Sequence, residues 1–558
     1  MNDYIIVGGG IGGLYFIDKL LDKGMVGNIL LIEKTARLGG RVSTGGKFNY
    51  EIGAGRFHSK QEKLINLLKK YKYTEKDFYL LDNSSRFIPT KKYKVWYDFS
   101  WIVDKLVGAS KKLAKGTLLK LNVLELCEKY LSRDIANYLK GRYEYDSELV
   151  WYNAVDGMKA IVGDLSNENK YFVLKGGLEG LVKKMEKKMK QDSLVVIKKD
   201  CYVKDVLCET DGGYLLKCLD GGGRDGGDIE FRGRKIIFAI DKSGLLKINY
   251  FNPYRELLNS VVTRPLLRMY AKFRRGRGGR GVWFAGMGKV VTDDPIRYII
   301  PINEEAGVIM ISYTDGGSAE YWNRYLTKNG KENLKKKIME HIRKLFPGKD
   351  IPDPEYFESY YWENGASYWK KNKDSSVLYK KIMKLDKGRD IYICGESYSK
   401  RQAWIEGALE SSSDVFDMCV GRKTRKKKKS KIKGGTVKKA KKGKKAKKGK
   451  TAKKGKTAKK GNTAKKSKTA KKGKTAKKKG DHKYTMAEVS KHNKQNDMWI
   501  VINGNVLDVT KWKDMHPGGS GVLTNYAGKD ATTAFNDRGH SDGAKKKMRT
   551  FIIGKVKK

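Results

Sequence analysis

The chain opens with short apolar runs separated by glycines. Residues 4–7 are apolar, and the glycine-rich stretch 8–13 follows at once. Apolar residues from 14 to 21 then recur at helical spacing, and a second apolar run, 29–32, ends in Glu33. This order predicts a buried parallel strand, a tight turn, a helix, a second strand and an acid. It is typical of a dinucleotide-binding α/β unit.

Each part of this pattern has a physical role in such a unit. Gly8 permits the tight turn, Gly10 allows a pyrophosphate to approach the backbone, and Gly13 allows the helix to pack closely on the strand. The helix N-terminus attracts phosphate, and Glu33 accepts hydrogen bonds from ribose hydroxyls. Gly8, Gly10, Gly13 and Glu33 are therefore candidate cofactor-binding residues.

A second alternating pattern lies near the C-terminus. Residues 498–502 and 506–510 read as two short strands joined by a turn at Asn503-Gly504. His516-Pro-Gly-Gly, a helical stretch and His540-Ser follow. This predicts a small α+β domain at 482–557.

Charge divides the chain between these two regions. The 558 residues carry a net charge of +57, and 422–480 alone contain 32 Lys and Arg and no acid. From 451 this segment repeats the hexad TAKKGK with small changes, and it has nothing to bury. We therefore expect a disordered Lys-rich linker at 422–480 between a body at 1–421 and the small domain.

The composition also bears on location. The six cysteines show no CxxC spacing, which favours a reducing compartment over a disulfide framework. No apolar run reaches the roughly 18 residues of a membrane span, and the N-terminus does not read as a secretory signal. We expect a soluble intracellular protein without a membrane anchor, in the cytoplasm or nucleus, with packaging alongside nucleic acid left open.

Two separated motifs resemble the flavin-containing amine oxidases, that is, monoamine and polyamine oxidases and their relatives. After the acid the chain reads RLGGR at 37–41 and YEIGAGRFH at 50–58, and near the end of the body it reads IYICGESYSKRQAWIEGALESS at 391–412. The resemblance covers the whole of 1–421. It implies a Rossmann-like FAD domain built from about 1–75, 170–250 and 385–421, and an α+β substrate domain from about 76–169 and 251–384.

The resemblance also implies which residues meet FAD. Contacts to the cofactor are expected from further positions in these motifs: Arg37, Gly40, Arg41, Gly53, Ala54, Val203, Gly395, Glu396, Trp404 and Ile405. Some relatives attach flavin through a cysteine where this chain has Ser367, so we expect FAD to be bound non-covalently.

The expected substrate site has both matches and departures. Trp404 and Tyr368 fall on the two positions of the family's aromatic cage, which surrounds an amine. Where many relatives have a lysine that holds a water near the flavin, the resemblance places Arg268 in this chain, with Lys272 four residues on along the same strand face. Arginine does not replace lysine equivalently, and it suits a substrate carboxylate. We expect a small amine or amino-acid substrate, with Trp404, Tyr368, Arg268 and Lys272 as candidate catalytic residues.

The C-terminal pattern resembles the cytochrome b5 haem-binding domain over about 70 residues. The resemblance implies haem b with His516 and His540 as its two iron ligands. A six-coordinate iron of this kind passes single electrons. The fusion therefore predicts an oxidoreductase that passes electrons from substrate to FAD, to haem and to oxygen or a one-electron acceptor.

The positive charge of the chain bears on the choice of substrate, and it also supports an alternative function. The net charge of +19 over 1–421 disfavours polycationic polyamines. The Lys-rich repeat resembles linker-histone tails, so 422–480 would bind nucleic acid or another polyanion without sequence choice. In that reading the protein is a polyanion-binding structural protein whose oxidase body is a scaffold.

Overall fold

A computed structural model describes residues 1–81, 85–163, 169–221, 227–276, 281–421, 482–513, 516, 520–537 and 542–557. The chain divides into two units, one built on Met1–Gly421 and one on residues that follow it. The basic repeat at 422–480, for which a disordered linker is predicted, lies outside the described residues.

A seven-stranded mixed sheet forms the first layer of the N-terminal unit. Its strand order is β10-β11-β12-β1-β2-β9, and β18 also pairs with β12. The pairs β1–β2, β1–β12, β2–β9 and β12–β18 are parallel, whereas β10, β11 and β12 pair antiparallel. The strands are β1 (Asn2–Val7), β2 (Ile29–Ile32), β9 (Val195–Lys198), β10 (Cys201–Cys208), β11 (Tyr214–Asp220), β12 (Asp228–Phe238) and β18 (Ile391–Ile393).

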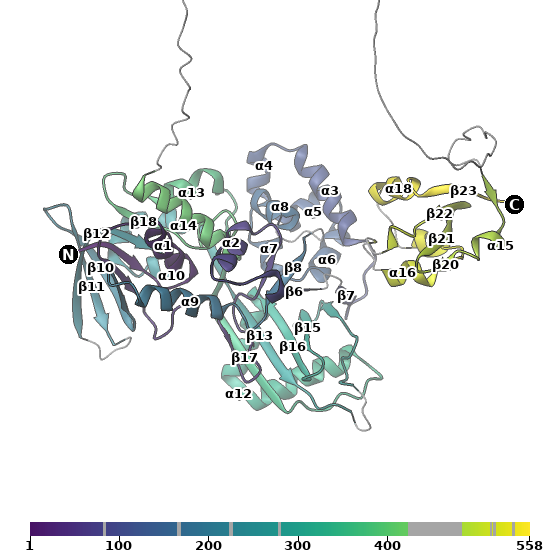
Figure 1. Cartoon of the computed structure of the whole chain (residues 1–558), viewed down its shortest axis with the longest axis horizontal. Coiled ribbons are helices and arrows are strands. Elements are labelled where there is room, and N and C mark those ends of the chain that lie inside the picture. The colour runs from purple at the N-terminus through teal and green to yellow at the C-terminus, as the bar shows by residue number, and fades with distance from the viewer. Residues whose placement is uncertain are drawn as a thin grey trace, which may run out of the picture. The chain divides into compact units, whose positions relative to one another are not determined.

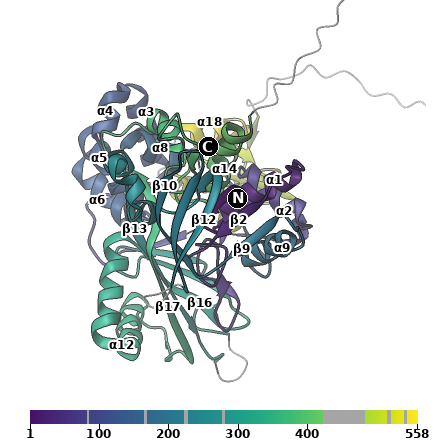
Figure 2. The same cartoon turned by 90° about the vertical axis from the view of Figure 1, so that its left-hand side faces the viewer.

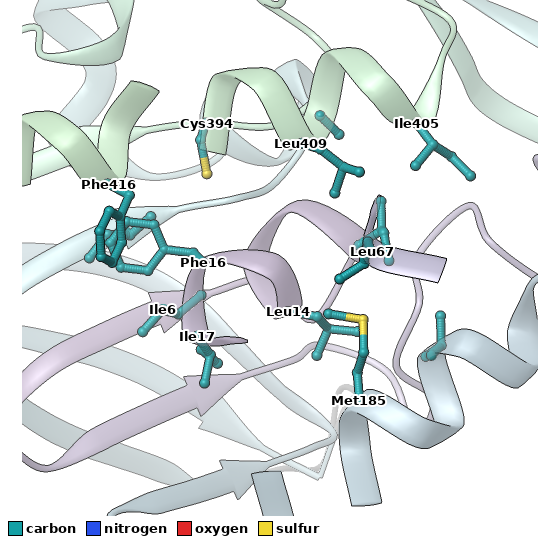
Figure 3. Packing of buried hydrophobic residues seen from close by; sticks show 14 of the residues in the cluster. Ile6, Leu14, Phe16, Ile17, Leu67, Met185, Cys394, Ile405, Leu409 and Phe416 are labelled. Carbon is teal, nitrogen blue, oxygen red and sulfur yellow. The ribbon is translucent and has the colours of Figure 1, made fainter. Parts of the chain in front are cut away.

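Helices α1 (Ile11–Asp22) and α14 (Ile405–Val420) pack together against this sheet. Figure 3 shows Leu14 and Phe16 of α1 in one apolar cluster with Leu409 and Phe416 of α14. The rings of Phe16 and Phe416 meet edge to face, 5.7 Å between centroids. Because α1 and α14 approach closely at Gly12, whose carbonyl accepts a 2.8 Å bond from the Ser412 hydroxyl, the start of α14 lies next to the glycine turn after β1.

A six-stranded sheet forms the second layer, in the order β17-β13-β16-β15-β14-β7. Figures 1 and 2 show its long strands beside α12 (Gly316–Leu345), which buries Leu334 and Ile338 against Met269 of β13. In register, Arg268 of β13 lies between Tyr313 of β16 and Tyr360 of β17. The strands are β7 (Ser85–Ile88), β13 (Val261–Lys272), β14 (Lys289–Thr292), β15 (Tyr298–Asn303), β16 (Val308–Asp315) and β17 (Tyr356–Trp369).

Smaller elements complete the N-terminal unit. Two short sheets join β3 (Thr44–Gly45) to β4 (Tyr50–Glu51), and β5 (Arg56–His58) to β8 (Tyr171–Leu174) and β6 (Phe78–Leu80). A helical cluster covers 99–163 with its own apolar core. It comprises α3 (Phe99–Lys111), α4 (Lys115–Lys120), α5 (Val123–Tyr130), α6 (Arg133–Arg142), α7 (Asp146–Val150) and α8 (Ala154–Gly163). The remaining helices are α2 (Glu62–Lys70), α9 (Glu179–Lys190), α10 (Lys242–Leu245), α11 (Arg255–Leu258), α13 (Ser375–Met383) and the 3-10 turns Glu75–Asp77 and Asn249–Tyr254.

The C-terminal unit carries a five-stranded sheet in the order β19-β23-β22-β21-β20. The predicted hairpin is β21–β22, and its turn residues Asn503 and Gly504 both have positive φ, 50° and 71°. The strands are β19 (Lys483–Tyr484), β20 (Asn493–Lys494), β21 (Asp497–Ile502), β22 (Asn505–Asp508) and β23 (Ile552–Val556). The helices that follow residue 481 in the chain are α15 (Met486–Val489), α16 (Ser520–Asn525), α17 (Thr532–Asp537) and α18 (Asp542–Arg549).

The described part of the chain contains no candidate for a membrane-spanning helix. None of its helices combines the length and the apolar character that a bilayer span requires.

Candidate functional site

A single cavity of about 1440 Å³ runs through the N-terminal unit and is lined by both large sheets. Pockets for drug-sized ligands usually measure about 300–1,000 Å³, so this one has room for a larger occupant. Most of the predicted FAD and substrate residues line it, namely Gly8, Gly10, Glu33, Arg37, Gly40, Arg41, Gly53, Ala54, Val203, Arg268, Tyr368, Gly395, Glu396, Trp404 and Ile405. Gly13 and Lys272 do not line it.

The glycine turn between β1 and α1 lies at one end of this cavity. Gly8 has φ of 108°, which favours glycine. A Cβ on Gly13 would lie 2.1 Å from the carbonyl oxygen of Gly8, so only glycine lets the helix pack here. A Cβ on Gly10 would meet no atom within 4 Å, because this position faces the open cavity. Gly13 is thus a packing residue, and Gly10 leaves the backbone accessible to a ligand.

Glu33 is held firmly at the end of β2. Its carboxylate accepts bonds from the backbone N–H of Gly9 (2.8 Å), the N–H of Thr35 (3.0 Å) and the Thr35 hydroxyl (2.8 Å). Only 7% of the residue is exposed, and it lines the cavity. The acid therefore has a fixed position beside the glycine turn.

The two predicted cofactor arginines differ in what they contact. The Arg37 guanidinium donates to the carbonyls of Leu38 and Val42, both at 2.9 Å, and so braces its own loop. The Arg41 guanidinium donates to the carbonyl of Gly365 and to Oε2 of Glu396, both at 2.9 Å. Arg41 thus links the loop after β2 to two distant segments.

Glu396 is the meeting point of several segments. Its Oε1 accepts bonds from the backbone N–H groups of Ser367 (3.0 Å) and Ala403 (2.8 Å), in addition to the Arg41 bond at Oε2. Gly53 fits closely below Arg41, since a Cβ there would lie 1.9 Å from the Arg41 carbonyl oxygen. The residues predicted to meet FAD therefore hold one another in place.

The two predicted cage aromatics line the same cavity. Trp404 is the N-cap of α14 and meets the ring of His58 edge to face, 5.2 Å between centroids. Tyr368 of β17 is 2% exposed and packs edge to face on Tyr152 at 4.9 Å. Whether these two rings enclose a substrate stays a prediction.

Sequence reasoning missed Arg56. Its guanidinium carbon lies over three rings, those of Tyr145 (5.6 Å), Tyr171 (5.2 Å) and Trp404 (5.7 Å). It lines the cavity, and among the described residues no carboxylate forms an ion pair with it. Although burial opposes the charge, the neighbouring tyrosines hold the pKa of Arg56 above its usual value. Arg56 stands two residues after Ala54, in the segment expected to lie near the flavin, and this position could have indicated it from the sequence.

Arg268 and Lys272 lie in different surroundings. Arg268 lines the cavity, donates to the carbonyl of Glu51 at 2.7 Å and lies 4.5 Å from the centre of the Tyr313 ring. No ion pair joins Arg268 to a carboxylate within the described residues. Lys272 instead pairs with Glu355 at 2.5 Å, with 30% of its side chain exposed. The catalytic role predicted for Lys272 has no support from the cavity geometry.

In the C-terminal unit the structure describes one of the two predicted iron ligands. His516 is partly buried, and its backbone N–H donates to the carbonyl of Lys513 at 3.3 Å. His540 lies outside the described residues. The pairing of the two imidazoles stays a prediction.

Two family models match the chain. A model described as flavin containing amine oxidoreductase matches residues 11–415, and one described as cytochrome b5-like heme/steroid binding domain matches 485–557. FAD follows from the first match and haem b from the second. Both agree with the resemblances found in the sequence.

Curated relatives match over a short stretch of about 70 residues. Cytochrome b5 isoform B of Arabidopsis thaliana is 49% identical over 73 residues, which are 13% of this chain and 54% of that protein. Cytochrome b5 of Borago officinalis is 48% identical over 73 residues, 13% of this chain and 55% of that protein. The NADH-cytochrome b5 reductase-like protein alnC of Emericella nidulans is 51% identical over 72 residues, 13% of this chain and 16% of that protein. The match thus spans about half of each plant protein and much less of the fungal one.

Proposed function

The chain belongs to the flavin containing amine oxidoreductase family, and we propose that it oxidises an amino acid with FAD and passes the electrons to its own haem domain. The general class, a flavin-dependent oxidoreductase with a cytochrome b5-like haem domain, follows from the family matches. The substrate, the electron relay and the residue roles are the proposal. FAD, when bound, accepts the hydride equivalent from the carbon next to the amine.

The residues present fit an FAD group. The Gly10 backbone borders an open part of the cavity, next to the N-terminus of the 12-residue helix α1. Glu33 stands at the end of β2, where a ribose is expected. We assign Gly8, Gly10, Glu33, Arg41 and the Gly53 turn to this cofactor. The FAD domain then comprises about 1–75, 170–250 and 385–421, and the substrate domain comprises about 76–169 and 251–384.

The attachment of FAD is proposed to be non-covalent. Ser367 stands where some relatives carry the attaching cysteine, and it is fully buried. Its hydroxyl lies 3.3 Å from Oε2 of Glu396 and 3.2 Å from the hydroxyl of Ser397. A serine hydroxyl held in this way offers no thiolate for a bond to flavin.

Arg56 is the observation that carries the substrate assignment. A cation that lines an aromatic cavity without a carboxylate partner favours a ligand that brings its own carboxylate. Arg268 adds a second such cation to the same cavity. An amine alone would leave both guanidinium groups without an anionic partner, whereas an amino acid supplies both the oxidisable amine and the anion. We therefore favour an amino acid over a simple monoamine.

The haem domain supplies the proposed exit for electrons. A bis-imidazole haem takes one electron at a time and leaves no open iron position for oxygen. His516 and His540 are the proposed ligands. Oxygen or a one-electron acceptor would then take the electrons from the protein.

Anaerobic mixing of the full chain with a panel of L-amino acids and primary amines tests this function. We expect an amino acid to bleach the flavin first and the reduced-haem bands to follow at a rate independent of protein concentration. Arg56→Met should weaken amino-acid reduction of the flavin at least tenfold and leave reduction by simple amines less affected. If simple amines reduce the wild-type flavin faster than every amino acid, the substrate assignment is wrong.

A His516→Ala variant serves as the control for the relay. Its flavin should still bleach, while no haem signal should appear. If the wild-type haem stays oxidised for many turnovers beside fully reduced flavin, the electron relay is wrong. The polyanion-binding alternative rests on 422–480, which lies outside the described residues, and the comparisons lend it no support.

A further inference from the structure

Glu148 is a buried acid in the wall of the cavity with little to compensate its charge. It lies in α7, is 6% exposed and lines the same cavity as Arg56. Its Oε2 accepts one bond, 2.6 Å long, from the hydroxyl of Tyr143. Within the described residues this is the only hydrogen bond of the carboxylate, and no cation forms an ion pair with it.

The position of Glu148 is fixed by its surroundings. Asp315 at the end of β16 accepts the backbone N–H groups of Asp146 (3.1 Å) and Ser147 (2.8 Å) and so anchors the start of α7. Arg297 pairs with Asp146 at 2.9 Å. Because this short helix is tied to the sheet, the acid cannot easily turn away from the cavity.

The groups around Glu148 set its protonation. Burial raises the pKa of Glu148 to about 8, and the nearby charges of Asp315 and Glu144 act in the same direction. The Tyr143 hydrogen bond and the Arg56 charge act in the opposite direction. Tyr368 of β17 also faces this acid: burial raises the pKa of the Tyr368 hydroxyl, and the charges of Asp315 and Glu148 raise it further. A carboxyl group in this state can change its protonation near neutral pH.

We propose that Glu148 binds the ammonium group of the substrate and takes one proton from it. This rests on the proposed function, because amine oxidation by flavin requires the neutral amine. In the step, one N–H bond of the substrate ammonium breaks and one O–H bond forms on the Glu148 carboxylate. The amine nitrogen keeps the electron pair, so no electrons are transferred. The proton leaves to water after the product departs.

Glu148 and Arg56 together match a zwitterion. When Glu148 is ionised, the two side chains carry opposite charges in one cavity, yet they form no ion pair with each other. An amino acid offers a carboxylate for the arginine and an ammonium for the acid. Each charged group of the protein would then gain a partner on binding.

Three probes separate the two roles: L-phenylalanine, 2-phenylethylamine, which lacks the carboxylate, and 3-phenylpropanoate, which lacks the amine. Binding to the oxidised full-chain protein is read from the perturbation of the flavin spectrum. We expect Glu148→Gln to weaken the binding of L-phenylalanine and of 2-phenylethylamine roughly tenfold or more. The binding of 3-phenylpropanoate should be unchanged. The rate of flavin reduction by L-phenylalanine should fall roughly 100-fold. Glu128→Gln is the matched control, because Glu128 neither lines the cavity nor acts on the pKa of Glu148, and it should behave as wild type.

The pH dependence gives a second readout that a merely structural role would not move. At saturating L-phenylalanine, the rate of flavin reduction in the wild type should fall as the pH drops through the pKa of Glu148. This fall is the acidic limb of the pH–rate profile, and it should be absent in Glu148→Gln. Tyr143→Phe removes the bond that favours the charged carboxylate, so its limb should move to higher pH.

The outcomes distinguish this inference from the proposed function. If Glu148→Gln binds the amines as wild type does and keeps the limb, the role of Glu148 is refuted, while the loss of 3-phenylpropanoate binding in Arg56→Met would still support an amino-acid site. If Tyr143→Phe lowers the rate equally at every pH, the limb does not belong to Glu148. If no amino acid reduces the wild-type flavin, both proposals fall.

Discussion

The guanidinium of Arg41 donates to Oε2 of Glu396 over 2.9 Å, and this bond joins two segments 355 residues apart in the chain. Glu396 is 7% exposed and also accepts the backbone N–H groups of Ser367 and Ala403. The residues expected to meet FAD thus form a network with one another, so a change in one of them disturbs several segments.

Replacing Glu396 by Ala is expected to destabilise the N-terminal unit by about 3 kcal/mol, because the partly buried Arg41 guanidinium and two backbone N–H groups lose their partner. FAD content should fall as well. Calorimetry of the flavin-free protein measures the first effect. Asp228→Asn, which breaks the exposed Lys204–Asp228 pair, is the control and should cost less than about 0.5 kcal/mol. Equal effects of the two changes would show that the network contributes little.

Two glycines of the turn after β1 should respond differently to alanine. At Gly13 the new Cβ would lie 2.1 Å from the Gly8 oxygen, so Gly13→Ala should destabilise the fold by about 1–3 kcal/mol or more. At Gly10 the Cβ meets nothing within 4 Å, and the backbone φ is −69°. Gly10→Ala should therefore fold as wild type and lose FAD affinity at least tenfold, because the methyl group occupies space next to the expected phosphates.

Thermal midpoints of the flavin-free variants and flavin fluorescence titrations separate these two effects. Gly116→Ala in α4 also meets nothing within 4 Å and serves as the control, with FAD affinity unchanged. Wild-type FAD affinity in Gly10→Ala would show that the turn does not approach the cofactor.

Local patterns were sufficient to predict the elements around the glycine turn. The apolar runs at 4–7 and 29–32 appear as β1 (Asn2–Val7) and β2 (Ile29–Ile32), and the helical spacing at 14–21 lies within α1 (Ile11–Asp22). Glycines and short apolar runs report on backbone geometry and burial, which depend on near neighbours in the chain. The strand and helix types were therefore accessible without tertiary information.

Roles that depend on tertiary contacts were not accessible. Arg37 contacts the carbonyls of its own loop, which no motif indicates. The period-two rule put Lys272 on the same face as Arg268, but the cavity does not extend to Lys272, which pairs with Glu355. Arg56 and Glu148 lie 92 positions apart, and only the folded chain brings both to one cavity.

The pH dependence of stability should report on Glu51, which lines the cavity. Burial raises its pKa from 4.5 to about 7. Because the folded chain keeps this proton to higher pH than the unfolded chain does, the stabilisation is complete below about pH 4.5 and is lost as pH rises through about 7. Glu51→Gln mimics the protonated acid. Relative to wild type, its free energy of unfolding should rise by roughly 2–3 kcal/mol between pH 5 and pH 8.

Calorimetry of flavin-free protein at several pH values checks this. Glu186→Gln is the matched control, because burial raises the pKa of Glu186 but the bonds from the Lys199 and Lys190 ammonium groups lower it further, to a net value below the usual one. Its difference from wild type should stay constant from pH 5 to pH 8. A constant difference for Glu51→Gln as well would mean that Glu51 ionises normally.

The two proposed haem ligands, His516 and His540, give the last prediction. His516 follows the β21–β22 hairpin at a partly buried position. His492 is also partly buried, but it stacks on the ring of Trp499, 3.5 Å between centroids, and its Nδ1 lies 2.8 Å from Oδ1 of Asp497. His516→Ala and His540→Ala should each abolish the low-spin haem bands in the reduced-minus-oxidised difference spectrum of the full chain, because each would remove one of the two proposed iron ligands. His492→Ala removes an imidazole that already has partners within its own domain, so its haem bands should persist even if the domain melts earlier. The ligand assignment is wrong if His516→Ala keeps the haem bands and His492→Ala loses them at a temperature where its domain is folded.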